Sequence, residues 1–284
     1  MGLVNCFNLR VVIVEAKRTP IGSFMGSLSK IPAALIGTKS IEAAIKSISL
    51  KPDLIDEVYF GNVLQAGVGQ APARQSAIYA GIPKSVPCTT INKVCSSGMK
   101  SISIAAQSIA LGHNNVVVAG GMENMSLSPH YLNLRRGAKL GATRLNDIME
   151  KDGLMDPFHN KLMGLYAEET AKKYRISREE QDKYCKQSYL RSQNAWNKGF
   201  FDNEICKIKI KDLNGKEINF KKDEECFNVN FDKIKKLKSP FLKGGTVTAA
   251  NSSTINDGSA ALILMSEKKA KKLNLNPLAE IISY

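Results

Sequence analysis

The sequence has no apolar run long enough to cross a membrane. Its longest apolar runs, VVIV at 11–14 and VVVAGG at 116–121, have the length of strands, whereas a spanning helix needs about 20 residues. The first ten residues leave no room for a secretory signal, and Cys6 stands where a myristoylated Gly2 would require a serine or threonine. We therefore expect a soluble protein with no membrane partner. Because an arginine-rich leader is also lacking, we expect the cytosol, with mitochondria as the second choice.

Cysteine and histidine are scarce, and no cysteine pair has the spacing of zinc ligands. Without a secretory signal, the six cysteines are expected to be reduced thiols of an intracellular protein. Only three histidines are available as possible bases. The cysteines are Cys6, Cys88, Cys95, Cys185, Cys206 and Cys226, and the histidines are His113, His130 and His159.

Acidic residues are outnumbered, with 26 against 40 lysines and arginines, which gives a formal net charge of +14. The lysines alternate with acids, a pattern typical of a solvated surface. Attraction of a polyanionic small ligand, such as a phosphorylated cofactor, is the alternative explanation. Basic and aromatic residues do not interleave as they do in nucleic-acid-binding proteins, so we expect no nucleic-acid partner.

Alternating strand-like and helix-like segments predict an α/β fold. VVIV has the β-branched composition of a buried strand, and residues 31–48 carry apolar side chains at near-helical spacing. A strand-like run followed by a helix-like segment occurs twice more. Residues 57–64 precede a second helix-like segment, and residues 87–94 precede a helix that ends at Gly112. We expect a mixed, mostly parallel sheet covered by helices.

Residues 122–249 have a different character, with many methionines and short turns. Ser177 and Glu180 form a capping-box pattern that predicts a helix start, and we expect an inserted, helix-rich loop domain. SAALILM at 259–265 returns to the buried-strand pattern, which predicts that it rejoins the first sheet. The expected units are 1–121 and 250–273 for the core, 122–249 for the insertion, and 274–284 for the start of a further domain.

Cys95 lies between a strand-like run and a helix rich in small side chains. The start of a helix is the positive end of its dipole and has unpaired backbone N–H groups, which favour the nucleophilic thiolate. Ser96, Ser97 and Gly98 leave room for a substrate carbonyl, and the Cys95 amide could donate to an oxyanion. Free cysteine also packs readily in protein cores. The residues alone therefore leave open whether Cys95 is a nucleophile or a buried core residue.

Five motifs in order resemble those of the thiolases. They are RTPIGSF at 18–24, GQAPARQ at 69–75, NKVCSSGMK at 92–100, AGGMENMS at 119–126 and GTVTAANSSTINDGSAA at 245–261. The resemblance covers almost all of 10–284 and is closest to the biosynthetic acetoacetyl-CoA thiolases, which are acetyl-CoA C-acetyltransferases.

The resemblance implies a layered thiolase-like fold and acyl transfer between CoA thioesters. Cys95 would attack an acyl-CoA to give an acyl-enzyme, which the carbanion of acetyl-CoA would then convert to a 3-ketoacyl-CoA. Acetyl-CoA, acetoacetyl-CoA and CoA would be the substrates, and no metal or redox cofactor would be required. The family also implies a homodimer or homotetramer.

CoA binding falls mainly to the insertion in this family. By position, six residues correspond to its pantetheine and adenine pocket, and Ser253 among them corresponds to a hydrogen-bond partner of the pantetheine arm. The six are Leu154, Met163, Leu237, Phe241, Ala249 and Ser253. The lysines at 233, 235, 236 and 238 are candidate partners of the CoA phosphates, although an exposed lysine cluster is more often plain solvated surface.

Two positions in the insertion depart from the family pattern. Leu162 stands where thiolases usually have a histidine, which weakens the inference of a short-chain preference. EECFNVN at 224–230 lacks the arginine that commonly stacks on the CoA adenine, so the affinity for CoA is expected to differ.

Thiolases have a second half that supplies an activating histidine, an acid/base cysteine and an Asn-Glu-Ala-Phe loop, and none of these motifs occurs here. The three histidines are expected to be structural or at the surface. We predict that these 284 residues alone are nearly inactive, that one side of the helix after Cys95 is bare, and that the natural protein is longer or is protected by dimerisation. A non-catalytic CoA-binding or oligomerising remnant is the alternative. A ketoacyl synthase is disfavoured by the insertion.

Overall fold

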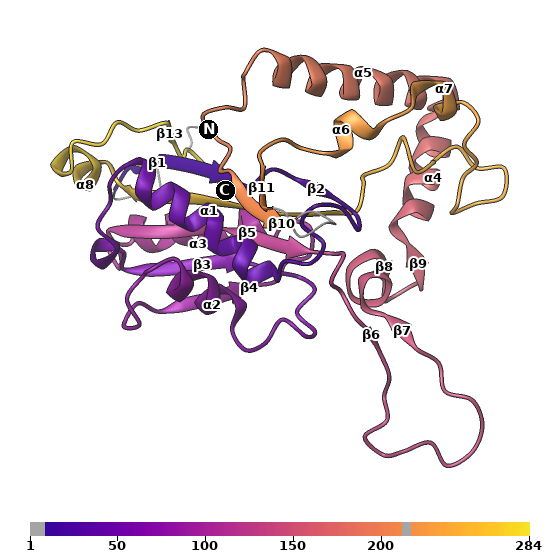
Figure 1. Cartoon of the computed structure of the whole chain (residues 1–284), viewed down its shortest axis with the longest axis horizontal. Helices are drawn as coiled ribbons and strands as arrows, with labels where there is room; N and C mark the ends of the chain where they lie inside the picture. Colours follow the sequence, from indigo (N-terminus) through magenta and orange to yellow (C-terminus); the bar gives the residue numbers. More distant parts are fainter. Residues whose placement is uncertain (1–8, 212–216) are drawn as a thin grey trace, which may run out of the picture.

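A seven-stranded sheet organises the protein, and the strand order is β13-β1-β12-β5-β3-β4 with β2 paired to β12 (Figure 1). The computed structural model describes residues 9–211 and 217–284, so Gly2 and Cys6 lie outside it. The strands are β1 (Val11–Arg18), β2 (Gly22–Ser23), β3 (Glu57–Gly61), β4 (Cys88–Ile91), β5 (Val116–Asn124), β12 (Asn256–Ser266) and β13 (Ala279–Glu280).

Five of the seven strands run in the same direction, which confirms the mixed, mostly parallel sheet. β3 pairs with β4 and β5 in parallel, whereas β12 is antiparallel to β1, β2 and β5, and β13 is antiparallel to β1. β12 contains SAALILM and lies between β1 and β5, so the return of the chain to its first sheet is also confirmed. Whether 274–284 belongs to a further domain stays a prediction.

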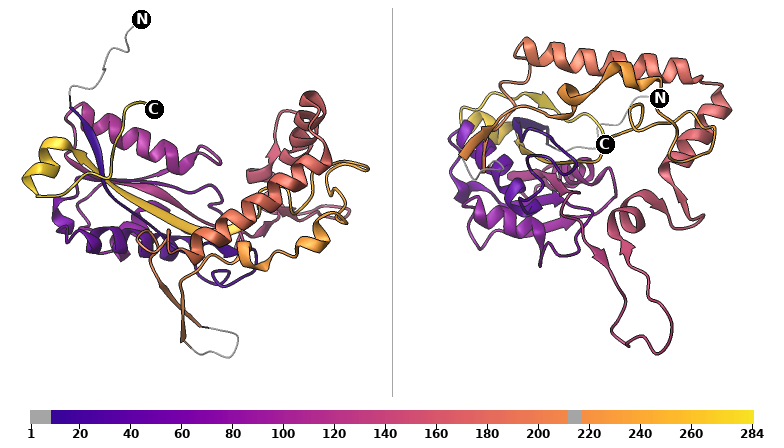
Figure 2. Two further views of the ribbon diagram at one scale, coloured as in Figure 1. Left: turned by 90° about the horizontal axis from the view of Figure 1, so that it is seen from above. Right: turned by 45° about the vertical axis from the view of Figure 1, so that its right-hand side comes forward.

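Helices cover both faces of the sheet (Figure 2, left view). On one face, α1 (Ala33–Ser47) and α2 (Pro72–Tyr79) bury Ile41, Ala44 and Ala77 against Val58 and Phe60. On the other face, α3 (Ser97–Ala110) packs Ala105, Ala106 and Ile109 against the sheet. These apolar clusters form the core, because burial of aliphatic side chains is the main favourable contribution to folding.

The outer side of α3 is bare, as the sequence predicted for a chain with one sheet. Met99 is 73% exposed and Leu111 is 70% exposed, although large apolar side chains are usually buried. The inner face of α3 carries small residues, of which Ser101 and Ala105 are fully buried. Small side chains on this face therefore permit close approach of the helix to the sheet.

The segment between β5 and β12 leaves the sheet and forms two long helices, several hairpins and extended loops (Figure 1). Ser177 and Glu180 form the expected capping box at the start of α5, in which the Glu180 carboxylate accepts from the Ser177 amide at 2.8 Å. The remaining elements are the turn Pro52–Leu54, β6 (His130–Tyr131), β7 (Asn146–Asp147), the π-helical turn Met149–Leu154, β8 (Met155–Asp156), β9 (Lys161–Leu162), α4 (Met163–Tyr174), α5 (Arg178–Asn197), β10 (Ile208–Lys211), β11 (Glu217–Phe220), α6 (Glu225–Asn228), α7 (Phe231–Ile234) and α8 (Glu267–Lys272).

Candidate active site

Cys95 lies in a tight turn between the end of β4 and the start of α3, and its side chain is exposed. The Ser97 hydroxyl closes this turn, because it accepts from the Lys93 amide at 2.9 Å and donates to the Val94 carbonyl at 2.6 Å. Val94 has φ +48°, in the left-handed region that β-branched residues rarely adopt. The turn therefore holds Cys95 at the surface, immediately before the first turn of α3, and it is not a buried core residue.

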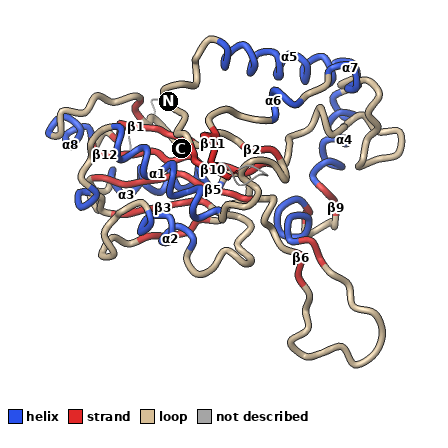
Figure 3. Tube along the Cα trace, in the orientation of Figure 1, coloured by secondary structure: helices blue, strands red, loops and turns tan. Residues whose placement is uncertain are grey.

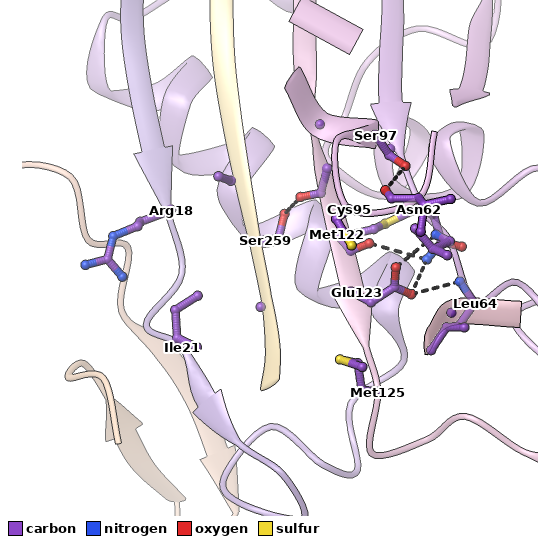
Figure 4. A pocket seen from close by; sticks show the side chains of 18 of the residues that line it. Arg18, Ile21, Asn62, Leu64, Cys95, Ser97, Met122, Glu123, Met125 and Ser259 are labelled. Carbon is purple, nitrogen blue, oxygen red and sulfur yellow. Dashed lines mark hydrogen bonds between the residues drawn. The ribbon is translucent and has the colours of Figure 1, made fainter. Parts of the chain in front are cut away.

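A cavity of about 390 Å³ opens beside Cys95 (Figure 4). Its lining is largely apolar and includes Leu64, Met122, Met125 and Leu154. Ligand pockets commonly combine such an apolar lining with a few polar groups. The cavity thus has the character of a ligand pocket with the Cys95 side chain in its wall.

Cys95 and the cavity lie at the carboxyl ends of the parallel strands β3, β4 and β5, where α/β proteins generally bind ligands. Glycines let the start of α3 approach this end of the sheet. A Cβ atom at Gly61 would lie 2.8 Å from the Ser97 Cβ atom, and a Cβ atom at Gly98 would lie 3.6 Å from the Gly120 carbonyl oxygen. The close contact places the helix start, and with it Cys95, directly on the ends of these strands.

Glu123, at the end of β5, is a polar member of the cavity lining that the sequence analysis did not single out. Its carboxylate accepts from the Asn62 side-chain amide at 2.8 Å and from the backbone amides of Val63 at 2.9 Å and Leu64 at 3.2 Å. Burial raises the pKa of Glu123, and these hydrogen bonds oppose that shift. The carboxylate therefore fixes the loop after β3 that forms one wall of the cavity. In the sequence, a functional role for Glu123 is indicated only by the position of this residue inside the motif AGGMENMS.

The histidines lie away from the cavity, as predicted. His130 is 3.9 Å from the Asp147 carboxylate on the β6–β7 hairpin, and the Nδ1 atom of His159 is 2.6 Å from the Asp156 carboxylate. His113 is exposed after the end of α3.

Across 9–211 and 217–284, three or more histidine, cysteine or acidic side chains nowhere form a group that could hold a metal ion. In the same ranges, no helix has the length and hydropathy to cross a bilayer.

The structure separates the residues that the resemblance assigned to CoA. Leu154 shares the cavity with Cys95, whereas Ser253 is exposed and lines a second cavity of about 460 Å³ with Tyr189 and Asn251. Ile21 lines both cavities, so the two are neighbours. The cavity beside Cys95 and the cavity lined by Ser253 therefore share a wall at Ile21.

The other assigned residues surround the start of α4 or lie in the loop after α7. The Phe241 ring packs on Gly164 so closely that a Cβ atom there would lie 2.3 Å from the ring, and the neighbouring Met163 is 45% exposed. Leu237 is half-buried and Ala249 is exposed, and neither lines the two cavities. The lysines at 233, 235, 236 and 238 are all exposed. Their contact with a ligand stays a prediction.

The fold and the site define an α/β protein with an accessible cysteine at a helix N-terminus beside an apolar cavity. The family model described as "Thiolase, N-terminal domain" matches residues 11–268. The chain therefore belongs to the thiolase family, as its motifs indicated.

Curated relatives carry consistent names. The chain is 51% identical over 275 residues to the mitochondrial acetyl-CoA acetyltransferase of Homo sapiens, and this alignment covers 96% of the chain and 64% of the human protein. Proteins of the same name from Mus musculus and Xenopus tropicalis are 50% and 52% identical, with 96% of this chain and 65% of each relative covered. The chain thus spans a little less than two thirds of the length of these relatives. These relatives are named as mitochondrial proteins, which matches the second choice of location and not the cytosol expected first.

Proposed function

We propose that Cys95 is the nucleophile of an acetyl-CoA C-acetyltransferase, with acetyl-CoA, acetoacetyl-CoA and CoA as its substrates. The observation that supports this most directly is the exposed Cys95 sulfur at the start of α3, beside an apolar cavity that Leu154 helps to line. A cavity of this kind suits the narrow pantetheine arm of CoA, whose thioester lies at its end.

In the proposed reaction, the Cys95 thiolate attacks the thioester carbonyl of an acyl-CoA. The carbon–sulfur bond to CoA breaks, and CoA leaves as its thiol after taking up a proton. A second acetyl-CoA then loses an α-proton, its carbanion attacks the acyl carbon, and the bond to Cys95 breaks to release acetoacetyl-CoA. No metal or redox cofactor is required, because the thioester acidifies the α-carbon.

The 284-residue chain is expected to turn over slowly by itself. Among the residues that the structure describes, the lining of the Cys95 cavity contains no histidine and one carboxylate, Glu123, which is held by three hydrogen bonds from the loop after β3. General acid–base assistance is typically worth about 10²–10⁴-fold in rate. Thiolysis of acetoacetyl-CoA by the purified chain at ordinary thiolase rates would contradict this expectation.

Selective alkylation tests the role of Cys95 without requiring turnover. Burial raises the pKa of every other described thiol, to about 11 for Cys206, so these thiols contain little of the reactive thiolate at neutral pH. They are Cys88, Cys185, Cys206 and Cys226. Iodoacetamide should therefore label Cys95 first, and a saturating concentration of CoA should slow that labelling.

The matched control is Cys95→Ser, which should lose the fast labelling phase. Incubation with radiolabelled acetyl-CoA should place one hydroxylamine-sensitive acetyl group on the wild-type chain and none on this variant. If CoA protects Cys95 but acetyl transfer is absent, the chain is a CoA-binding remnant without catalysis. If CoA gives no protection, both the catalytic and the binding proposals fail.

We further propose that the six assigned residues, five in the insertion and Ser253 just after it, contact CoA and that the chain forms a homodimer or homotetramer. The exposed outer side of α3 and the exposed Leu140 on the arm between β6 and β7 support association, because exposed apolar surface favours burial in an interface. Sedimentation equilibrium of the purified chain tests the oligomeric state, and a monomer at micromolar concentration would contradict it.

A further inference from the structure

Glu168, on α4, is a buried carboxylate that the proposed chemistry does not use. Its side chain accepts four hydrogen bonds from the segment 239–247: from the Ser239 hydroxyl at 2.9 Å, the Thr246 amide at 2.9 Å, the Thr246 hydroxyl at 3.0 Å and the Val247 amide at 2.8 Å. Both carboxylate oxygens are therefore engaged by one loop. A charged acceptor that receives several hydrogen bonds holds its donors strongly.

The close approach of this loop to α4 depends on a glycine. A Cβ atom at Gly245 would lie 2.3 Å from the Glu168 Oε1 atom and 2.9 Å from the Ser239 hydroxyl oxygen. Glu168 is only 7% exposed. Burial by itself raises the pKa of Glu168, but the hydrogen bonds outweigh burial and lower it, so the carboxylate is charged at neutral pH.

A second set of polar contacts holds the same loop from α5. The Asn251 side chain accepts from the Thr248 amide at 2.6 Å and donates to the Thr246 carbonyl and the Asp182 carboxylate at 3.0 Å each. Arg178 donates to that carboxylate at 2.8 Å and to the Leu237 carbonyl at 3.0 Å. The loop is thus held at both ends by polar groups that are buried, as Asp182 is, or half-buried, as Arg178 and Asn251 are.

The loop has no regular secondary structure between α7 and β12, and it passes beside α4 (Figure 3). Its backbone is held by these hydrogen bonds, and Val247 is buried at 4% exposure. Three other apolar side chains stay accessible, since Leu242 is 49% exposed and Leu237 and Phe241 are half-buried. A fixed backbone that presents accessible apolar side chains is the arrangement of a preorganised binding surface, which lowers the entropy cost of binding.

We propose that Glu168 is a positioning residue for CoA, because it holds the loop 237–251 in the shape that receives the pantetheine arm. This inference rests on the proposed function, since it assumes that Leu237, Phe241 and Ala249 on this loop contact the arm. Glu168 acts through the loop and does not contact the ligand. The lysines at 233, 235 and 236, which are candidate partners of the CoA phosphates, precede the part of the loop that Glu168 holds. Binding of the nucleotide phosphates should therefore depend less on Glu168 than binding of the pantetheine arm does.

The test compares Glu168→Gln with Glu169→Gln in the full chain. Glu169 is the next residue on α4 and pairs with Lys161 at 2.6 Å, but its side chain is 55% exposed, so it is matched in charge and position without touching the loop. Isothermal titration calorimetry would measure the affinities for CoA, pantetheine and adenosine 3′,5′-bisphosphate. Thermal unfolding would be followed for the same samples.

Glu168→Gln should weaken CoA and pantetheine binding about tenfold, since it replaces a charged acceptor by an amide whose NH₂ group faces backbone donors. Its affinity for adenosine 3′,5′-bisphosphate should stay within about twofold of wild type, and Glu169→Gln should leave all three affinities unchanged. This selective loss separates positioning of the arm from a general loss of structure, which would weaken all three ligands.

Ser239→Ala provides a second variant in case Glu168→Gln does not fold, because it removes one donor from the loop side and leaves α4 intact. It should weaken pantetheine binding about threefold. Unchanged pantetheine affinity in both variants, with CoA still bound by wild type, would overturn the positioning role alone. Absence of CoA binding by the wild-type chain would instead overturn the proposed function.

Discussion

The core sheet and the insertion are stabilised by different forces. In β5 the run Val116–Ala119 is fully buried, and β12 buries Ile263, Leu264 and Met265 completely. In α5, by contrast, only Asp182 and Cys185 are buried among 20 residues. The core therefore depends on apolar burial, whereas α5 and the loops packed beside it depend largely on specific polar contacts. The candidate site is therefore bordered by one region packed around buried apolar side chains and one that is held by a small number of hydrogen bonds.

The two regions meet where Arg18 leaves the end of β1. The Arg18 guanidinium donates to the Asp223 carboxylate at 2.8 and 3.1 Å and to the Glu204 carboxylate at 2.6 Å. Asp223 also accepts from the Ile21 amide at 2.7 Å and from the Trp196 indole at 3.1 Å. Because Arg18 and Ile21 line the Cys95 cavity, this junction sets one wall of the candidate active site.

The largest effect is expected from Gly120→Ala in the core. Gly120 has φ +156°, and a Cβ atom there would lie 2.1 Å from the Ala260 carbonyl oxygen of β12 and 2.8 Å from the Phe60 ring. The two strands cannot move apart here without breaking the β5–β12 ladder. We expect a loss of more than about 3 kcal/mol in the free energy of unfolding, measured by urea denaturation.

Gly112→Ala is the control for this substitution. Gly112 also has a positive φ, +77°, but a Cβ atom there would meet nothing within 4 Å, so only backbone strain of about 1 kcal/mol is added. Equal losses for the two variants would show that steric exclusion in the sheet is not the cause, and the contrast between a rigid core and its surroundings would fail.

A smaller effect is expected at the junction from Asp223→Asn. The amide keeps the shape of the side chain but removes the charge that faces Arg18, and hydrogen bonds to charged groups contribute about 1.5–3 kcal/mol. We expect a loss of about 2 kcal/mol in the free energy of unfolding, together with faster proteolysis of the insertion and an unchanged core. Glu204→Gln removes the charge of the other carboxylate that faces Arg18, which is 43% exposed, and should cost less than about 1 kcal/mol. The reverse order of the two effects would contradict the assignment of Asp223 as the central contact.

Much of the core could be predicted from the sequence because its signals are local. β-branched runs in β1 and β5, the helix starts at Ser97 and Ser177, and the buried-strand pattern of β12 all depend on neighbouring residues. The β10–β11 hairpin was missed, although IKIK alternates as a strand should. Ile208, Ile210 and Phe220 pack on Leu28 and Ile36, and these partners lie far away in the sequence.

The candidate site was predictable only in part, for the same reason. The position of Cys95 follows from a local strand-to-helix turn, whereas the contacts of Glu123 come from a loop about 60 residues earlier. The positions of Leu154 and Ser253 in the sequence also could not show that these two residues line different cavities. Tertiary contacts decide these features, and single-residue patterns carry no information on them.

The smallest and most local effect is expected at the β8–β9 hairpin of the insertion. Tyr166 and His159 both hydrogen bond to the Asp156 carboxylate, with His159 at 2.6 Å. The Tyr166 hydrogen bond, followed by that of His159, lowers the pKa of Asp156 to about 2, and the same contact with Asp156 raises the pKa of Tyr166 to about 12. The stabilisation should therefore be present between about pH 4 and pH 10, the ordinary values of the two groups.

The stabilisation from the hydrogen bond between Tyr166 and Asp156 should be lost at both extremes of pH. As the pH falls toward 2, Asp156 takes up a proton, and as the pH rises toward 12, the Tyr166 phenol loses its proton. Carbon-13 NMR titration of the Asp156 carboxyl measures this directly. In Tyr166→Phe the pKa of Asp156 should move back toward its ordinary value, while urea denaturation of the core stays unchanged because the hairpin lies outside the core sheet. An Asp156 titration that is identical in the two proteins would show that the phenol does not hold this carboxylate, and the hairpin would then be stabilised by something other than the polar contacts that characterise the insertion.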